Sequence, residues 1–360
     1  MKVLLLGGTG AMGKYLSALL SERGDDVYVT SRSHHPDQEH LFFLRGDAHD
    51  MEFLKETLNN SWDAIVDFMS YRVTEFSSRV GLLLKNTKQY IFLSSSRVYS
   101  DSTNPLTETS PRLLEESKDT SFLETEEYSL TKAREEDILK GSGLKNYTIV
   151  RPYLTYETYR LQLGDMEKES WLYRALSGRT IVFSSDMAEC RTTMTYGKDV
   201  AVCISKIIGN ETTFGEIYNP VSNVSYTWKE VLAVYQEIIG SVTGVCPKVK
   251  WTGKSDSLLS STKKYQVLYD RYFDRTFDNK KIESLGRDIK FTPLRDGIYE
   301  CLTDFIKAPS FKPISFLEEG RKDSITGDRL ALSKIPGAKD KVVYFLCRYC
   351  RLYNLLKKLK

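Results

Sequence analysis

Cysteine and histidine are scarce in this chain of 360 residues, which contains six cysteines and four histidines. The histidines fall early, at His34, His35, His40 and His49, and the first cysteine is Cys190. Cys347 and Cys350 form a Cys-x-x-Cys, but no second pair and no histidine lies near it in the sequence, so we expect no metal. A secreted domain held by disulfides would be denser in cysteine, so free thiols in a reducing cytoplasm are expected.

Long apolar runs and a strong net charge are also missing. The apolar start Met1–Leu6 meets glycines at once and is too short for a secretory signal. No segment approaches the ~20 apolar residues that a membrane span needs. The net charge is only +3, so overall charge does not draw the chain to nucleic acid. The composition predicts a cytoplasmic protein with no nucleic-acid partner.

The first half of the chain alternates short apolar strands with helical segments. Strands are predicted at Val3–Leu6, Val27–Thr30, Leu41–Leu44, Ala64–Phe68, Tyr90–Ser94 and Tyr147–Val150. Helices are predicted up to about Glu22 and at Met51–Leu58, Val73–Lys85 and Glu124–Lys140. This rhythm predicts an α/β fold, a Rossmann doubly wound parallel sheet covered on both faces.

The second half has a looser pattern, which predicts a smaller C-terminal substrate-binding domain. We expect a Rossmann domain at 1–155 that takes back 192–220, and a substrate-binding domain at 156–191 and 221–335. Residues 336–360 are expected to form a basic amphipathic helix. Such a helix either docks on its own domain or a second subunit, or lies on an anionic membrane surface.

A glycine-rich turn links the first strand to the first helix, with the spacing Gly7-x-x-Gly10-x-x-Gly13. Glycines let the backbone turn tightly and approach a pyrophosphate, which the helix N-terminus then binds. The second strand ends in Ser31-Arg32 instead of a carboxylate. Arg32 suits a 2′-phosphate, so NADP is favoured and NAD stays open. Asp47, after the third strand, is placed to accept a hydrogen bond from adenine.

Tyr128 and Lys132 are four residues apart in a predicted helix, so both side chains lie on one face. A free tyrosine has a pKa of about 10, and a nearby ammonium stabilises the phenolate, which makes a usable acid/base. The fifth strand ends in three serines, Ser94–Ser96, at the sheet edge where such folds bind ligands. The pattern does not decide which of the three hydroxyls faces a substrate.

These motifs together resemble the extended short-chain dehydrogenase/reductases, the superfamily of nucleotide-sugar epimerases, dehydratases and reductases. The resemblance rests, in chain order, on Gly7–Gly13, Asp47, Ser94–Tyr99, Tyr128/Lys132 and Arg151-Pro152. It continues more loosely through 193–202 and 278–286.

The resemblance implies a role for each matching residue. Tyr128 would be the acid/base, Lys132 its electrostatic partner and a cofactor ligand, and Ser95 the catalytic serine. The implied cofactor ligands are Gly7, Thr9, Gly10, Ala11, Met12, Gly13, Ser31, Arg32, Asp47, Met69 and Lys132. The implied substrate ligands are Ser96, Arg97, Tyr153 and Arg191. The family also implies a homodimer.

One departure from the family narrows the chemistry. Sugar 4,6-dehydratases carry an Asp-Glu pair where this chain has Ser96-Arg97, and an elimination needs its own acid and base. We therefore expect an NAD(P)-dependent nucleotide-sugar epimerase in cell-surface polysaccharide or related sugar biosynthesis. An NADPH-dependent reductase of a keto nucleotide sugar is the first alternative. A non-catalytic dinucleotide-sensing protein of the same fold is the second.

Overall fold

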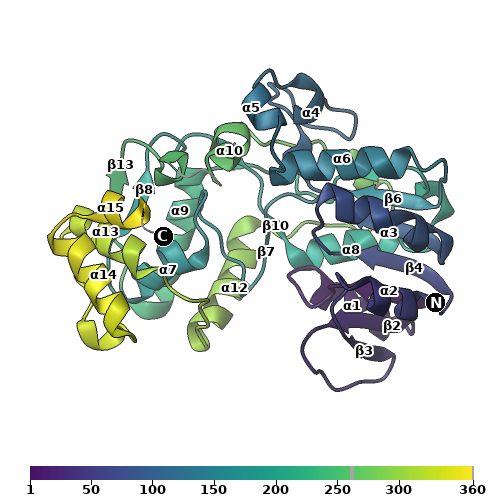
Figure 1. Cartoon of the computed structure of the whole chain (residues 1–360), viewed down its shortest axis with the longest axis horizontal. Coiled ribbons are helices and arrows are strands. Elements are labelled where there is room, and N and C mark those ends of the chain that lie inside the picture. Colours follow the sequence, from purple (N-terminus) through teal and green to yellow (C-terminus); the bar gives the residue numbers. More distant parts are fainter. Residues whose placement is uncertain (260–262, 359–360) are drawn as a thin grey trace. The chain divides into compact units, whose positions relative to one another are not determined.

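The computed structural model describes residues 1–259 and 263–358 and divides the chain into two compact units (Figure 1). The first unit comprises Met1–Glu157, Arg191–Ser225 and Phe273–Gly297. The second comprises Thr158–Cys190, Tyr226–Tyr272 and Ile298–Lys360. The chain thus leaves the first unit and returns to it twice.

A seven-stranded parallel sheet forms the centre of the first unit, in the order β11-β6-β5-β4-β1-β2-β3. Its strands are β1 (Lys2–Leu6), β2 (Asp26–Ser31), β3 (Leu41–Arg45), β4 (Trp62–Asp67), β5 (Thr87–Leu93), β6 (Tyr147–Val150) and β11 (Ile217–Tyr218). The predicted doubly wound fold is confirmed, with all six predicted strands present. The short strand β11 was not predicted, because two residues carry no periodicity.

Helices cover both faces of this sheet. The helices of the first unit are α1 (Gly13–Glu22), α2 (Met51–Leu58), α3 (Val73–Lys85), α4 (Leu113–Glu116), α5 (Thr120–Leu123), α6 (Tyr128–Lys140), α8 (Gly197–Ile207) and α11 (Lys280–Glu283), with 3₁₀ turns η1 (Ser96–Val98) and η2 (Glu211–Thr213). The short helices α4 and α5 lie beyond α6 and not on the sheet (Figure 1). Short strands β7 (Thr155–Tyr156) and β10 (Thr195–Tyr196) pair in parallel, and β9 is Arg191–Thr192.

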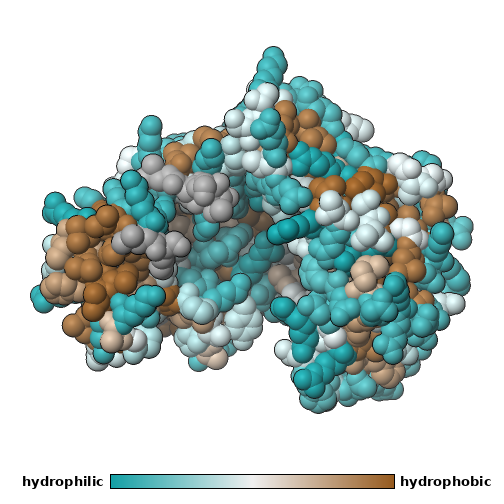
Figure 2. All heavy atoms as spheres, viewed as in Figure 1, coloured by the Kyte–Doolittle hydropathy of each residue, from teal (hydrophilic) through white to brown (hydrophobic). Residues whose placement is uncertain are grey.

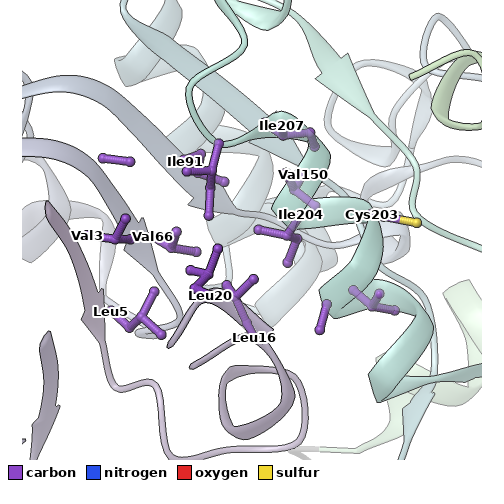
Figure 3. Packing of buried hydrophobic residues seen from close by; sticks show 14 of the residues in the cluster. Val3, Leu5, Leu16, Leu20, Val66, Ile91, Val150, Cys203, Ile204 and Ile207 are labelled. Carbon is purple, nitrogen blue, oxygen red and sulfur yellow. The ribbon is translucent and has the colours of Figure 1, made fainter. Parts of the chain in front are cut away.

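Strand β1 shows why both faces must be covered. Val3 and Leu5 belong to one buried cluster, and Leu4 and Leu6 belong to the cluster on the opposite face. The first cluster joins the strands to α1 and α8, as the side chains in Figure 3 show. The sequence of a strand that is buried on both faces is a continuous apolar run.

Two boundaries differ from those predicted. Phe273–Gly297 was expected in the substrate-binding domain, but Ile282 and Ile289 pack into the same cluster as α1 and α8, so it belongs to the first unit. Helix α6 starts at Tyr128 instead of Glu124, because the Glu127 side chain accepts a hydrogen bond from Ser129 N and caps the helix there. Tyr128 is therefore the first helical residue.

The second unit is mainly helical. Its elements are α7 (Lys168–Leu176), α9 (Trp228–Thr243), α10 (Lys264–Gln266), α13 (Phe316–Thr326), α14 (Ala338–Tyr349), α15 (Tyr353–Lys358), the turns η3 (Asp256–Leu259), η4 (Val267–Arg271) and η5 (Leu332–Lys334), and β12 (Tyr226–Thr227). Helix α12 (Leu294–Lys307) enters it from the first unit, and strands β8 (Ile181–Ser184) and β13 (Val249–Thr252) pair in parallel. Up to Lys358, the C-terminal helix that was expected at 336–360 is two helices, because Arg351 has a φ of +57° and interrupts the helical path, and residues 359–360 of that prediction lie outside the described residues.

Buried ion pairs hold α13 against α7 and the turn that follows it. The Arg174 guanidinium contacts Glu319 at 3.1 Å and Asp323 at 2.8 Å. Arg179 contacts the same two carboxylates at 2.7 and 3.2 Å, and the Tyr344 hydroxyl donates to Asp323 at 2.7 Å. The network ties α14 to the second unit through Tyr344.

Candidate active site

The glycine turn after β1 is shaped by two glycines that the protein itself requires. Gly7 has a φ of +66°, which other residues rarely adopt, and its N–H donates to the Thr30 hydroxyl on β2 at 2.9 Å. A Cβ on Gly13 would stand 2.3 Å from the Gly8 carbonyl oxygen. The turn and the start of α1 can therefore form only with glycine at these positions.

Gly10 has no such internal reason to be glycine. A Cβ there would meet no protein atom within 4 Å. The N-cap residue Met12 makes no side-chain hydrogen bond to α1, and the first turn carries no acidic residue. The loop thus presents an open approach to helical N–H groups, which fits the pyrophosphate of a dinucleotide.

A cavity of about 310 Å³ lies beside this turn. It is lined by Gly7, Thr9, Thr30, Ser31, Arg32, Ser33, Gly46, Asp47, Ala48, His49 and Met69. The cavity therefore brings together six of the cofactor residues predicted from sequence: Gly7, Thr9, Ser31, Arg32, Asp47 and Met69.

One side of this cavity carries a cation, directly after β2. Arg32 is exposed there, between Ser31 and Ser33. Asp47 is exposed on the facing loop and accepts a hydrogen bond from His49 N at 3.0 Å. Asp50, and not Asp47, caps α2, accepting from Glu52 N at 2.8 Å. Asp47 is thus not needed as a helix cap.

Helix α6 holds Tyr128 and Lys132 in contrasting surroundings. Tyr128 is 39% exposed at the start of the helix, and Lys132 one turn later is 2% exposed. The Lys132 ammonium lies 3.4 Å from the Met69 carbonyl oxygen and 3.0 Å from Glu135. Met69 lines the cavity, so the lysine lies directly behind this lining residue.

The three serines after β5 have different tasks. The Ser94 hydroxyl donates to Glu136 at 2.6 Å, and the Ser96 hydroxyl donates to the Arg151 carbonyl at 2.6 Å. The Ser95 oxygen accepts from Arg97 N at 3.2 Å, which leaves the hydroxyl proton of Ser95 to donate elsewhere. Ser96, expected as a substrate ligand, is fully buried with its proton used inside the fold.

Glu136 on α6 contacts the residues that follow β5 and β6, Ser94 and Arg151. Arg151 donates to both its oxygens, at 2.8 and 2.6 Å, in a buried bidentate pair. Burial works to raise the pKa of Glu136, but the hydrogen bonds from Arg151 outweigh it and hold that pKa below its usual value. The pair fixes α6 relative to the ends of β5 and β6.

Two further buried carboxyls lie near Lys132. Burial raises the pKa of Glu135 to about 7, although Lys132 works in the opposite direction. Burial also raises the pKa of Asp67, at the end of β4, which accepts from Tyr90 at 2.7 Å and from Met69 N at 2.9 Å. Sequence reasoning missed Glu135, Glu136 and Asp67. Only the position of Asp67 after an apolar strand offered a signal.

The substrate residues expected from the resemblance lie in different surroundings. Arg97 pairs with Glu127, and its guanidinium lies 5.3 Å from the centre of the Tyr128 ring. Arg191 is half-buried and donates to the Ser225 hydroxyl at 3.1 Å and to its carbonyl at 2.8 Å. Tyr153 is buried against Phe277, with ring centres 5.5 Å apart.

Comparison with known families decides what this arrangement is. The model of the NAD dependent epimerase/dehydratase family matches residues 3–219. The chain belongs to this family. The membership confirms the expected extended short-chain dehydrogenase/reductase type and its enzyme class.

Individual relatives of this family member are distant. A chloroplast stem-loop binding protein of 41 kDa (form b) from Arabidopsis thaliana is 27% identical over 249 residues, which is 64% of this chain and 61% of that protein. The chain thus spans about three fifths of that relative's length.

Two solved structures share the fold. The Bordetella bronchiseptica enzyme WbmH, solved with NAD⁺, has a TM-score of 0.63 at 18% identity, over 86% of this chain and 99% of that one. A UDP-glucuronic acid 4-epimerase from Bacillus cereus, solved with UDP-glucuronic acid and NAD, has a TM-score of 0.63 at 18% identity, over 85% and 99%.

Proposed function

We propose that this protein is an NAD(P)-dependent epimerase of a nucleotide sugar that uses Tyr128 as its acid/base. The observation that carries the proposal is the placement of α6. It leaves Tyr128 accessible and puts Lys132 against Met69, a lining residue of the dinucleotide cavity. The UDP-sugar named for the Bacillus cereus structure supports a nucleotide sugar as substrate.

The residues divide the work as follows. The residues that line the cavity would hold the dinucleotide, which would supply a reversible acceptor for the hydride of the sugar carbon, and return of that hydride to the opposite face would invert the carbon. The Tyr128 hydroxyl oxygen takes the proton of the sugar hydroxyl and later gives it back. The Lys132 ammonium stabilises the phenolate, and the Ser95 hydroxyl donates to the sugar oxygen. Ser95 is favoured over its neighbours because Ser94 and Ser96 donate within the fold.

NADP is the cofactor that the proposal favours. Arg32 offers a cation at the end of β2, and the only carboxylate among the residues lining that cavity is Asp47. Mass spectrometry of the protein as purified identifies any bound dinucleotide. Arg32→Ala is expected to weaken NADP binding about tenfold or more and to leave NAD binding nearly unchanged. Equal losses for both dinucleotides would remove this preference.

The experiment that tests the reaction compares Tyr128→Phe with the wild type on UDP-, GDP- and CDP-sugars. Loss of the proton acceptor is expected to lower kcat/KM by about 10²–10⁴-fold while dinucleotide binding persists. An epimerase equilibrates two sugars without net use of cofactor, whereas a reductase consumes NADPH in proportion to product. A fully active Tyr128→Phe variant would sink the proposal.

A second candidate, binding of structured RNA, is favoured by one observation. The Arabidopsis relative is named as a stem-loop binding protein, whereas the sequence led us to expect no nucleic-acid partner. A gel-shift assay with an RNA hairpin and a mutated hairpin tests it. Specific binding that survives Tyr128→Phe would establish an activity independent of the acid/base pair.

A further inference from the structure

Helix α14 is apolar on two opposite faces, and one of them is docked. Tyr344 and Cys347 are buried against α13. A Cβ on Gly320 of α13 would stand 2.7 Å from the Tyr344 carbonyl and 2.8 Å from the Cys347 Cβ, so the two helices touch at their backbones. This face anchors α14 and fixes which residues point outward.

The outward face is also apolar. Val342, Phe345 and Tyr349 follow one another at helical spacing and are 57%, 48% and 50% exposed. The exposed apolar side chains continue past the break with Leu352 and Leu355. Figure 2 shows this region as a brown patch over α13, α14 and α15. We call these five residues the outer stripe. A contiguous exposed patch of this kind marks an interaction surface.

Basic residues surround the outer stripe. Between residues 334 and 358 the basic residues are Lys334, Lys339, Lys341, Arg348, Arg351, Lys357 and Lys358, against one acidic residue, Asp340. The helical period puts Lys341 and Arg348 on one side of the stripe and Lys339 on the other. Lys339, Arg351 and Lys358 are exposed.

We propose that α14 and α15 bind an anionic lipid surface, with the outer stripe inserted at the interface and the lysines and arginines on the headgroups. Apolar insertion and electrostatic attraction act together in stable interfacial binding. Each basic residue near such a surface contributes about a fivefold gain in partition. No helix within residues 1–259 and 263–358 is long and apolar enough to cross a bilayer, so the mode is peripheral.

Two other occupants fit this surface less well. RNA is bound by cations and by flat rings on which bases stack, and Phe345 and Tyr349 are such rings. The other three members of the stripe, Val342, Leu352 and Leu355, are aliphatic and suit the acyl boundary of a bilayer better than stacked bases. A second copy related by a two-fold axis would place this basic face against itself, and like charges repel. An anionic bilayer complements both the charge and the apolar stripe.

Flotation of the full chain with vesicles tests the proposal. Vesicles of phosphatidylcholine with about a third phosphatidylserine are expected to carry the protein, and pure phosphatidylcholine vesicles are not. Phe345→Ser with Leu355→Ser is expected to weaken binding about tenfold or more, and Lys339→Gln with Lys358→Gln about 25-fold. Val245→Ser, a change at an exposed apolar residue of the same unit outside the stripe, is the matched control and should float like the wild type.

Several outcomes would overturn the proposal. One is an absence of binding to the anionic vesicles by a wild-type chain that melts cooperatively. Another is binding that the Phe345/Leu355 double variant retains in full. A wild-type dimer that this variant converts to monomers, with no flotation, assigns the stripe to a second copy. An RNA hairpin bound through the stripe, again without flotation, assigns it to nucleic acid.

Discussion

Both units bury ion pairs, but the pairs stand in different places. In the first unit, Lys132 and Glu135 lie behind a residue that lines an open cavity. In the second, Arg174 and Asp323 lie among packed helices, with a salt-bridge distance of 2.8 Å and no exposed side-chain surface. Burying a charge is expensive in either place. The difference predicts that a buried charge serves a functional site only where a cavity gives a ligand access to it.

The largest expected effect is on catalytic activity, and it distinguishes the Lys132–Glu135 pair from the Arg174–Asp323 pair. Lys132→Met removes the ammonium that stabilises the phenolate, and kcat/KM on the nucleotide sugar is expected to fall about 10³-fold or more. Far-ultraviolet circular dichroism and dinucleotide binding check that the variant remains folded. If Lys132→Met keeps wild-type activity, the lysine is structural, and the buried ion pairs of the two units do not differ in function.

In the second unit, weakening the buried ion pair is expected to lower stability and to change activity little. Asp323→Asn leaves Arg174 and Arg179 with a weakened partner, so the free energy of unfolding should fall by about 3–5 kcal/mol in denaturant titration. The kcat of the remaining folded protein should change little. Asp304→Asn, at an exposed ion pair of α12, is the matched control and should alter stability by about 0.5 kcal/mol or less.

Within the first unit, Ser95 and Ser96 allow a similar comparison between an effect on activity and an effect on stability. Ser95→Ala is expected to lower kcat about 10–100-fold with little change in melting temperature, because the proposed role of its proton is to donate to the sugar oxygen and its own oxygen only accepts from Arg97 N. Ser96→Ala deletes a buried hydrogen bond to the Arg151 carbonyl and should cost about 1 kcal/mol of stability. Kinetics and calorimetry on both variants test this, and the reverse pattern would move the catalytic role to Ser96.

The smallest expected effect depends on pH. Burial raises the pKa of Glu135 to about 7, above its value in the unfolded chain, so stability falls as pH rises from about 4.3 to that value. Glutamine resembles the protonated form, so Glu135→Gln should match the wild type below about pH 5. Above about pH 8 the two should differ a few-fold in kcat/KM, since only the wild type then pairs Lys132 with a carboxylate. Identical pH profiles would show that Glu135 does not act on Lys132.

Sequence predicted the parts of the fold that depend on local pattern. Short apolar runs and the Gly7–Gly13 turn carry their signal within a few residues, and both were found. The return of 273–297 to the first unit depends on Ile282 and Ile289 meeting α1 and α8, which is a contact between distant segments. The choice among the serines likewise depends on Glu136 and Arg151, far along the chain. Local pattern cannot supply such pairings.

A substitution at Gly10 would separate the dinucleotide-dependent roles of the protein from its other roles. Because no protein atom lies within 4 Å of the missing Cβ, Gly10→Val should fold and yet fill the space that a pyrophosphate needs. A strain carrying this allele would lose every phenotype that depends on the dinucleotide and keep those that arise from lipid or RNA binding. The single substitution Gly10→Val would thus show, in a living cell, which roles of the protein need the dinucleotide.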